Sequence, residues 1–298
     1  MTDEAKPPAT VHAFVPNCPD EGNVRWTFIG ELLVRAGKLK PEDVERILEL
    51  QQKRPMRFGE LAKRLGMLKV HELNAALSDQ FGGTALRLRH EGLSSELVVA
   101  LDPFGPKAGE IHAIRNRLTA TSLTNDRPVI AIASAEERDG RSYLSANLAT
   151  SFAQRGIRTL LIDANLRAPR LHQIFNIKNT YGLAPLLATG AGIGKLRGTV
   201  LLGSLAVLPA GPTPRGPLPL LGSAGFPQLL DRARHHFDLI LLDTPSGRHA
   251  DIDVIASCAT GALIVARKNN TKAHGLSALL TRLRELGVHP LGSVLNVH

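Results

Sequence analysis

The stretch VIAIASAEERDGRSYLSANLATSFAQRGIRTLLID, residues 129–163, decides the fold of this chain. Its apolar runs Val129–Ala133 and Thr159–Ile162 are typical of buried strands, and an acid, Asp163, ends the second. A polar loop separates the first run from Leu144–Arg155, whose apolar residues recur with a helical period. Strand, loop, helix and parallel strand make a βαβ unit. Because the loop ends with glycine, a basic residue and serine at a helix start, it is suited to bind phosphate.

The same alternation of apolar strands and helical segments continues to the end of the chain. Further strands are expected at Leu205–Leu208, Leu239–Leu242, Ala262–Val265 and Leu291–Leu295. Helices are expected at Ser142–Arg155, Arg170–Phe175, Pro227–His235, Asp253–Cys258 and Ala273–Leu286. This alternation predicts an α/β fold with a doubly wound, mostly parallel sheet of P-loop NTPase type. A proline-rich loop, residues 209–217, should cross the mouth of that sheet, where such folds bind ligands.

A repeat fills much of the N-terminal part of the chain. Three residues of the first copy recur at one common offset in the second, pairing Gly30 with Gly59, Gly37 with Gly66 and Gln51 with Gln80. Each copy reads as a short helix ended by glycine, a turn, and a second helix that begins at Pro41 or Val70. Two such hairpins would bury their apolar faces against each other. The repeat therefore predicts a small all-α domain ahead of the α/β domain.

These patterns divide the chain into a disordered tail, the helical repeat, a connector and the α/β domain, at residues 1–25, 26–83, 84–126 and 127–298. The tail is rich in proline and has little periodicity. In the connector, Leu97–Leu101 is expected to be a short strand and Gly109–Leu118 a basic helix.

Composition and charge limit the classes of function. With 43% hydrophobic and 21% charged residues the chain is typical of globular proteins, and 4% aromatic residues argue against a stacking platform for single-stranded nucleic acid. The formal net charge of +9 fits an anionic partner such as a nucleotide or the inner membrane surface, and no sequence-specific nucleic acid is expected. Cys18 and Cys258 lack metal-ligand spacing. Without a long apolar run or a leader-like N-terminus, the sequence predicts a cytoplasmic location.

The loop before Leu144 carries the residues expected to bind a nucleotide. A P-loop wraps backbone N–H groups around phosphates, places a cation on their oxygens and sets a hydroxyl on Mg²⁺. Arg141 stands where that cation is usually lysine, Arg138 where the loop usually has glycine, and Tyr143 where threonine or serine is usual. The expected nucleotide contacts are Arg138, Asp139, Gly140, Arg141, Ser142, Tyr143 and Asn296.

Two acids end buried strands at positions suited to a metal. Asp243 follows the apolar run Leu239–Leu242 in the Walker B form, in which the carboxylate holds the Mg²⁺ shell. From the end of its own strand, Asp163 could reach Mg²⁺ or polarise an attacking hydroxyl. The sequence thus predicts ATP and Mg²⁺ as cofactors, Ser142, Asp163 and Asp243 as metal ligands, and Asp163 and Arg141 as catalytic residues.

The segment Leu160–His172 resembles the Walker A′ segment of bacterial tyrosine kinases, whose usual form is Leu-Leu-Ile-Asp-Ala-Asp-Leu-Arg-x-Pro. Further segments that match the same family are Asn179–Leu183, the loop from Leu208, Phe237–Pro245 and Gly292–Asn296. The resemblance implies an ATP-dependent tyrosine kinase, a P-loop NTPase related to MinD and ParA, that acts in exopolysaccharide chain-length control. It also implies a homo-oligomer at the cytoplasmic face of the inner membrane, held there by a membrane chain-length regulator.

The chain departs from that family at two places that bear on catalysis. Asn165 stands where the second Walker A′ acid is expected, and no C-terminal tyrosine cluster exists, because Tyr143 and Tyr181 are the only tyrosines. These departures leave open a second hypothesis, a pseudo-kinase that serves as an adaptor in the same export machinery. A partitioning ATPase of the ParA or MinD type is a further alternative.

A third departure concerns oligomerisation. Family members carry a helix of the form Glu-x-x-Arg-x-x-Arg. When Arg115 is aligned with the last arginine, this chain has Gly109 and His112 in the other two places.

The N-terminal repeat has a resemblance of its own. Its motif is similar to that of the N-terminal domain of type II secretion and type IV pilus ATPases, which in some of those proteins binds cyclic di-GMP. An arginine suits this ligand because it pairs with phosphate and stacks on guanine. The second copy keeps that arginine as Arg57, whereas the first has Phe28. The resemblance implies Arg57 as a cyclic di-GMP contact, with a protein-docking module as the alternative.

Overall fold

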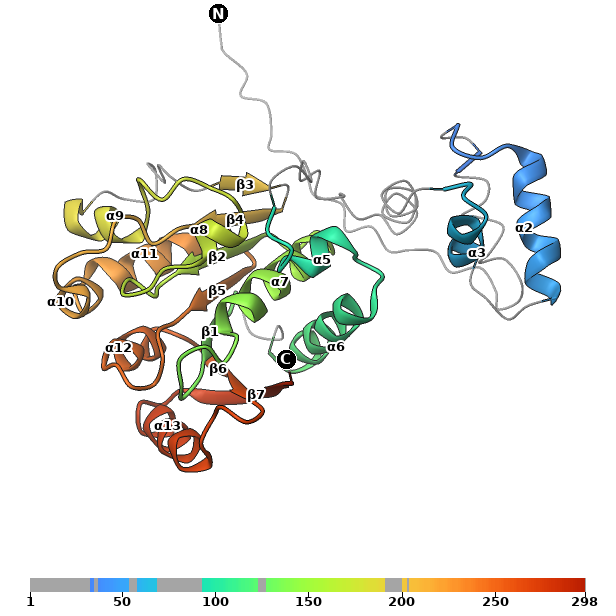
Figure 1. The fold of residues 1–298 in the computed structure, drawn as a ribbon. Coiled ribbons are helices and arrows are strands. Elements are labelled where there is room, and N and C mark those ends of the chain that lie inside the picture. The colour runs from blue at the N-terminus through green and yellow to red at the C-terminus, as the bar shows by residue number, and fades with distance from the viewer. Residues whose placement is uncertain are drawn as a thin grey trace, which may run out of the picture. The chain divides into compact units, whose positions relative to one another are not determined.

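The computed structural model describes residues 33–34, 37–53, 58–68, 93–122, 127–190, 200–202 and 204–297. The chain forms two compact units, Met1–Leu68 and Lys69–His298 (Figure 1). Among the described residues, no helix combines the length and the apolar character needed to cross a membrane.

The larger unit is built on one seven-stranded sheet. Its strands are β1 (Val129–Ala133), β2 (Thr159–Asp163), β3 (Val200–Leu202), β4 (Leu205–Leu208), β5 (Leu239–Asp243), β6 (Gly261–Arg267) and β7 (His289–Asn296). They lie in the order β3-β4-β2-β5-β1-β6-β7. Every neighbouring pair is parallel except β3 and β4. The predicted doubly wound, mostly parallel sheet is confirmed.

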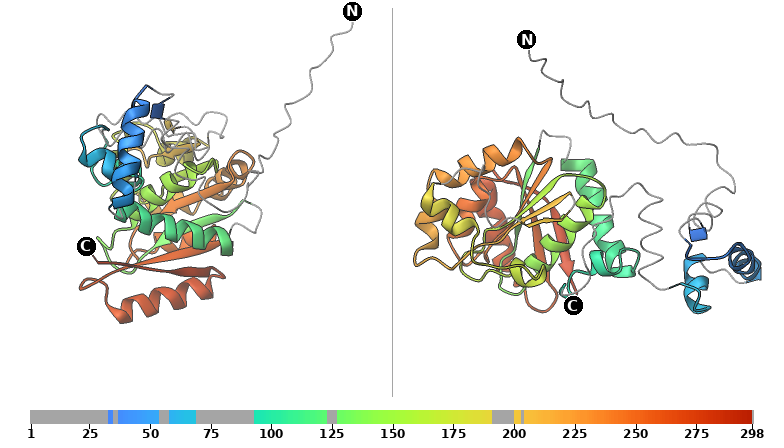
Figure 2. Two further views of the ribbon diagram at one scale, coloured as in Figure 1. Left: turned by 90° about the vertical axis from the view of Figure 1, so that its right-hand side faces the viewer. Right: turned by 90° about the horizontal axis from the view of Figure 1, so that it is seen from above.

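Helices cover both faces of this sheet (Figure 2). They are α5 (Val98–Leu101), α6 (Pro106–Ser122), α7 (Arg141–Ala153), α8 (Leu171–Ile174), α9 (Leu183–Thr189), α10 (Pro217–Leu221), α11 (Gly225–Arg234), α12 (Asp251–Ser257) and α13 (Ala273–Glu285). Alternate strand residues serve opposite faces, because successive side chains of a strand point to opposite sides. In β1, Ile130 and Ile132 join the core under α5–α8, while Val129 and Ala131 join the cores on the other face, under α9–α13.

The connector differs from its prediction. Leu97–Leu101, expected to be a strand, contains the short helix α5. A short apolar run fits a buried strand and a buried helix equally well, and here α7 decides between them. The side chain of Asn147 accepts a hydrogen bond from Val99 N at 3.0 Å, and Gln154 Nε2 donates to Val99 O at 3.0 Å. The basic helix expected at Gly109–Leu118 lies within the longer α6.

Three elements of the α/β unit, β3, α9 and α10, were not predicted. The prolines of residues 209–217 concealed α10, since Pro217 occupies its first turn, where a proline is tolerated. The start of that loop does lie at the carboxyl end of β4, where Pro209 O and Ala210 O accept hydrogen bonds from the first turn of α9.

The smaller unit contains α2 (Pro41–Lys53) and α3 (Phe58–Arg64). Gly37 and Gly66, the glycines that correspond in the two copies of the repeat, both adopt left-handed backbone with φ of +66° and +68°. In each copy the next residue donates a hydrogen bond five residues back, to Leu33 O or Ala62 O. Both glycines therefore end a helix in the same way, as the repeat predicts. The expected tail, Phe28, Arg57 and the second helix of the second copy lie outside the described residues.

Candidate functional site

The loop of residues 134–140 joins β1 to α7, and two of its residues adopt left-handed backbone. Gly140, just before α7, has φ of +100°, and a Cβ there would lie 2.5 Å from Asn296 Nδ2. This position therefore requires glycine. Arg138 has φ of +61°, a conformation that glycine adopts freely and that costs other residues about 1–2 kcal/mol. Arg138 therefore adopts the left-handed backbone of the glycine that usually stands at this position of the loop.

Arg141 begins α7 and ties the loop to the end of β5. Its side chain is buried, with 8% exposed. Nε donates to Thr244 O at 2.9 Å, and Nη1 donates to Glu136 O at 2.7 Å and to the hydroxyl of Ser134. Burial lowers the pKa of Arg141, and the nearby carboxylate of Asp243 opposes that shift. Within the described part of the chain Nη2 makes no hydrogen bond, so one edge of the guanidinium can face a phosphate.

Asp139 is fully buried, and protein groups bind its carboxylate. Oδ2 accepts from Glu136 N at 3.1 Å, while Oδ1 accepts from Asn270 Nδ2 at 2.8 Å and from Thr271 Oγ1 at 2.7 Å. These bonds attach the loop to the segment after β6. Asp139 therefore shapes the loop with its side chain, and the predicted nucleotide contact is left to its backbone.

Asp163 and Asp243 lie next to each other, as last residues of the adjacent parallel strands β2 and β5. Both are fully buried. Asp163 Oδ2 accepts hydrogen bonds from Arg170 N at 2.9 Å and Leu171 N at 3.0 Å. Asp163 Oδ1 and both carboxylate oxygens of Asp243 have no hydrogen-bond partner among the described residues. Two buried acids with three unsatisfied oxygens are a high-energy arrangement in the absence of a cation.

The pKa values of Asp163 and Asp243 are shifted by burial, and that of Asp163 also by the like charge of its neighbour. Loss of hydration raises the pKa of Asp243 to about 6. The hydroxyls of Ser142 and Ser145, which lie near this carboxylate without the geometry of a hydrogen bond, and the charge of Arg141 oppose that shift. The pKa of Asp163 is raised well above its usual range, first by burial and then by the charge of Asp243. A bound divalent cation would reverse both effects, because it favours the ionised carboxylates.

The donor set fits Mg²⁺. This cation prefers a few carboxylate and hydroxyl oxygens and keeps water in its remaining positions. Ser142 lies in the first turn of α7, near enough to Asp243 to affect its pKa. Among the described residues, no group of three or more acid, histidine or cysteine side chains is placed to hold a metal ion. Two acids and a hydroxyl suit Mg²⁺ beside a triphosphate better than a cage made of protein ligands alone.

Asn165 does not face this pair. Its Nδ2 donates to Ala168 O at 2.9 Å, and its Oδ1 accepts from Ala168 N at 3.2 Å, so the side chain closes the turn after β2. Arg167, which belongs to the same turn, forms a two-point ion pair with the buried carboxylate of Asp251 at 2.6 and 3.2 Å. This ion pair attaches the turn to the start of α12. This turn supplies the two N–H groups that fix Asp163.

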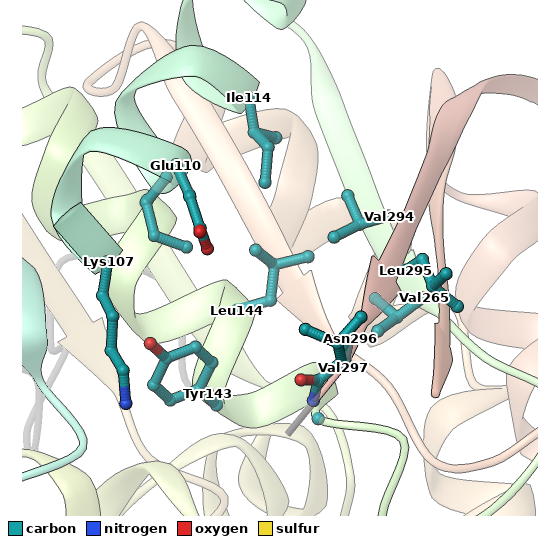
Figure 3. A pocket seen from close by; sticks show the side chains of 12 residues that line it. Lys107, Glu110, Ile114, Tyr143, Leu144, Val265, Val294, Leu295, Asn296 and Val297 are labelled. Carbon is teal, nitrogen blue, oxygen red and sulfur yellow. The ribbon is translucent and has the colours of Figure 1, made fainter. Parts of the chain in front are cut away.

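A cavity of about 70 Å³, partly open to solvent, lies beside the loop and is bordered by Gly140 and Asn296. Its walls come from α6, α7 and the ends of β6 and β7 (Figure 3). The ring of Tyr143 stands among Lys107, Glu110 and Asn296, with aliphatic side chains behind it (Figure 3). A mostly apolar cavity with a few polar groups, beside a phosphate-binding loop, is suited to the nucleoside part of a nucleotide.

The structure thus brings Ser142, Asp163 and Asp243 together, and it places Gly140, Tyr143 and Asn296 around the adjoining cavity. Arg138 is exposed at the crest of the loop. Sequence reasoning missed the residues that hold the loop, namely Ser134, Thr244, Asn270 and Thr271, and it missed Asp251, which holds the turn after β2. Except for Ser134, whose partners Glu136 and Arg141 are near in the chain, their partners lie far away in sequence, so no spacing marks them. For Thr244 alone there was a local signal, its place directly after the Walker B acid.

Comparisons with known proteins show which proteins the chain resembles. No protein-family model matches the chain. CapB of Staphylococcus aureus is 33% identical over 209 residues, which are 68% of this chain and 89% of CapB. The tyrosine-protein kinase CpsD of Streptococcus agalactiae is 32% identical over 187 residues, 62% of this chain and 81% of CpsD.

A solved structure, the kinase domain of the Escherichia coli tyrosine kinase Etk, superposes with a TM-score of 0.64 and 29% identity, over 70% of this chain and 83% of that domain. The match spans only 29% of full-length Etk. The chain belongs to the family of bacterial tyrosine-protein kinases.

Proposed function

We propose that the α/β unit binds ATP with Mg²⁺ and transfers its γ-phosphoryl group to a tyrosine hydroxyl. One observation carries this proposal: three carboxylate oxygens of Asp163 and Asp243 are buried without a hydrogen-bond partner in the described part of the chain, at the strand ends beside a phosphate-binding loop. ATP supplies the phosphoryl group, and Mg²⁺ neutralises the charge on the phosphates when it is bound.

Each residue has a distinct role in this proposal. Ser142 and Asp243 hold Mg²⁺, with Asp163 beside them. The backbone of residues 138–143 surrounds the phosphates, and Arg141 faces them with Nη2 while its other nitrogens fix the loop. Asp163 accepts the proton of the attacking tyrosine or water. Its two backbone hydrogen bonds orient the carboxylate and leave Oδ1 for that proton.

A second function, an adaptor that binds nucleotide without turnover, is favoured by Asn165. This residue gives its amide to the turn at Ala168 and adds no carboxylate to the site. An aspartate there would add a negative charge near the metal, which this chain lacks. The adaptor and the kinase share the binding site and differ only in turnover.

The setting of either function follows from the family. The chain acts in exopolysaccharide export, at the cytoplasmic face of the inner membrane, with a membrane chain-length regulator as partner and with self-association into a homo-oligomer. Cyclic di-GMP binding at Arg57 is a separate proposal that rests on the motif alone, since Arg57 lies outside the described residues. Titration of wild type and Arg57→Ala with cyclic di-GMP tests it, and indistinguishable curves would reduce the repeat to a docking module.

Phosphoryl transfer to a glutamate–tyrosine copolymer tests the kinase proposal. Wild type should label the copolymer, and Asp163→Asn should reduce the rate by about 10²-fold or more, because general base catalysis is lost. Asp231→Asn, which changes an exposed acid on α11, is the matched control and should keep the wild-type rate. Equal rates for wild type and Asp163→Asn would remove Asp163 from the mechanism. Binding of Mg-ATP without any transfer would select the adaptor.

A further inference from the structure

Helix α6 forms one wall of the cavity beside the phosphate-binding loop. It contributes Lys107, Glu110, Ile111 and Ile114 to the lining. The side chains of Lys107 and Glu110 reach toward Tyr143, and that of Ile114 reaches toward Val294 of β7 (Figure 3). The aliphatic side chains and the ring of Tyr143 suit the faces of a purine, while Lys107 and Glu110 offer a donor and an acceptor to its edge.

The face of α6 that packs on α7 contains an arginine in its middle. Ala108, Ile111 and Leu118 of this face belong to the core, and Arg115 lies between them at helical spacing with 9% of its surface exposed. Burial lowers the pKa of Arg115 to about 10. Its hydrogen-bond partners in the described part of the chain are all neutral, namely Asn116, His112 and both oxygens of Ser151. The docking of α6 thus depends on a buried cation that has hydrogen bonds and no counter-charge.

His112 and Ser151 complete this polar junction. His112 Nε2 lies 2.9 Å from Pro103 O, which can only accept, so Nε2 carries the proton. In the neutral ring Nδ1 is then an acceptor, and it faces Ser151 Oγ at 2.7 Å and Arg115 Nη1 at 3.3 Å. Since Ser151 lies on α7, the junction fixes α6 against the helix whose first turn faces the phosphates.

We propose that α6 is the base-side wall of the nucleotide site, and that Arg115, His112 and Ser151 are positioning residues that set the affinity for the nucleoside part of the nucleotide and not for its phosphates. The inference rests on the proposed nucleotide binding. It gives the helix that the family resemblance associates with oligomerisation a role inside its own subunit, with Arg115 turned inward.

Binding of Mg-ATP and of Mg-tripolyphosphate to the full chain separates base from phosphate contacts. Ser151→Ala is nearly isosteric and removes one hydrogen bond to a charged group, so it should weaken ATP binding about three- to tenfold. Ile114→Trp fills the cavity and should weaken ATP binding more than Ser151→Ala does. Both variants should bind tripolyphosphate as the wild type does. Arg117→Ala removes an exposed charge from the same helix and should change neither affinity.

Hydrogen exchange on the wild type gives a measurement that no variant's folding can disturb. Mg-ATP should protect the amides of residues 107–118 more than Mg-tripolyphosphate does, because only ATP carries a base to contact α6. Equal protection, or equal loss of both affinities in Ser151→Ala and Ile114→Trp, would overturn the inference. If the wild type bound both ligands with equal affinity, the inference about α6 would be wrong and the proposed function would stand. If neither ligand bound, both the inference and the proposed function would be wrong.

Discussion

Asp163 and Asp243 are register partners at the ends of β2 and β5, and three of their four carboxylate oxygens have no hydrogen-bond partner among the described residues. The sequence of each strand explains its burial, but nothing in the fold requires an acid at its end. Apolar residues or hydrogen-bonded polar ones would stabilise the sheet better. The stability of the fold therefore does not explain why two acids stand here. Binding of a cation together with an anionic ligand does explain it.

Replacing Asp243 by asparagine should stabilise the metal-free protein at neutral pH. The pKa of Asp243 is raised to about 6 in the folded state, above its usual value of 3.8, so the folded state binds more protons and its stability falls as pH rises from about 4 to about 6. At pH 7.5 in EDTA, Asp243→Asn should gain on the order of 2 kcal/mol, measured by urea denaturation.

Two comparisons control this prediction. The gain should vanish near pH 3, below the usual pKa of 3.8, where the carboxyl is mostly protonated in both states, and Asp231→Asn should show no gain. Mg²⁺ should stabilise the wild type and not Asp243→Asn. A variant less stable than the wild type at pH 7.5 in EDTA would mean that the buried pair is satisfied in a way that the structure does not show.

Arg141→Lys should destabilise the protein although it keeps the charge. The guanidinium reaches Thr244 O with Nε while Nη1 bonds Glu136 O, and a single ammonium cannot take both places. The loss should be about 1–3 kcal/mol, measured by urea denaturation without nucleotide. Arg117→Lys, at an exposed position of α6, should have no effect. Equal stability of Arg141→Lys and wild type would show that these bonds do not hold the loop.

Arg138→Gly should stabilise the loop, because glycine adopts the left-handed backbone of this position without strain. The expected gain is about 0.5–1 kcal/mol, since the more flexible unfolded chain offsets part of the relief. Arg138→Ala keeps the Cβ and removes only the charge, so it should show no such gain in the same denaturation experiment. A gain shared by both variants would assign the effect to charge.

The junction at His112 should make stability depend on pH. Protonation of Nδ1 would turn an acceptor into a donor that faces Arg115, and burial together with the charges of Arg115 and Arg155 lowers the pKa of His112 below its usual 6.5. The unfolded state then binds more protons, so stability should fall as pH drops below about 6.5. His112→Asn should reduce this dependence in thermal melts between pH 5 and 7. An unchanged slope would contradict the neutral tautomer.

Sequence patterns predicted the parts of the fold that local chemistry determines. Apolar runs ended by Asp163 and Asp243 located the strands β2 and β5, and parallel pairing then brought the two acids together. The prediction of a strand at Leu97–Leu101 was wrong, because the groups that fix this run as a helix, Asn147 and Gln154, come from a distant part of the sequence.

In the candidate site, too, local sequence predicted some features and distant contacts determine the others. Ser142, Asp163 and Asp243 were predicted from their places at element ends, and they lie together. Arg141 ties the loop to the end of β5, and Asn165 closes the turn after β2. Both roles depend on hydrogen-bond acceptors that only the folded chain brings into place. The residue type shows which groups a side chain can offer to a ligand. Tertiary contacts decide which of those groups the protein itself already binds.

Calorimetric titration of the full chain with ATP, with and without Mg²⁺, tests the central claim most directly. The account predicts saturable binding to the wild type in the presence of Mg²⁺, much weaker binding in EDTA, and loss of that difference in Asp243→Asn. Asp231→Asn should match the wild type. No binding of Mg-ATP at millimolar concentration, or the same affinity with and without Mg²⁺, would contradict the account.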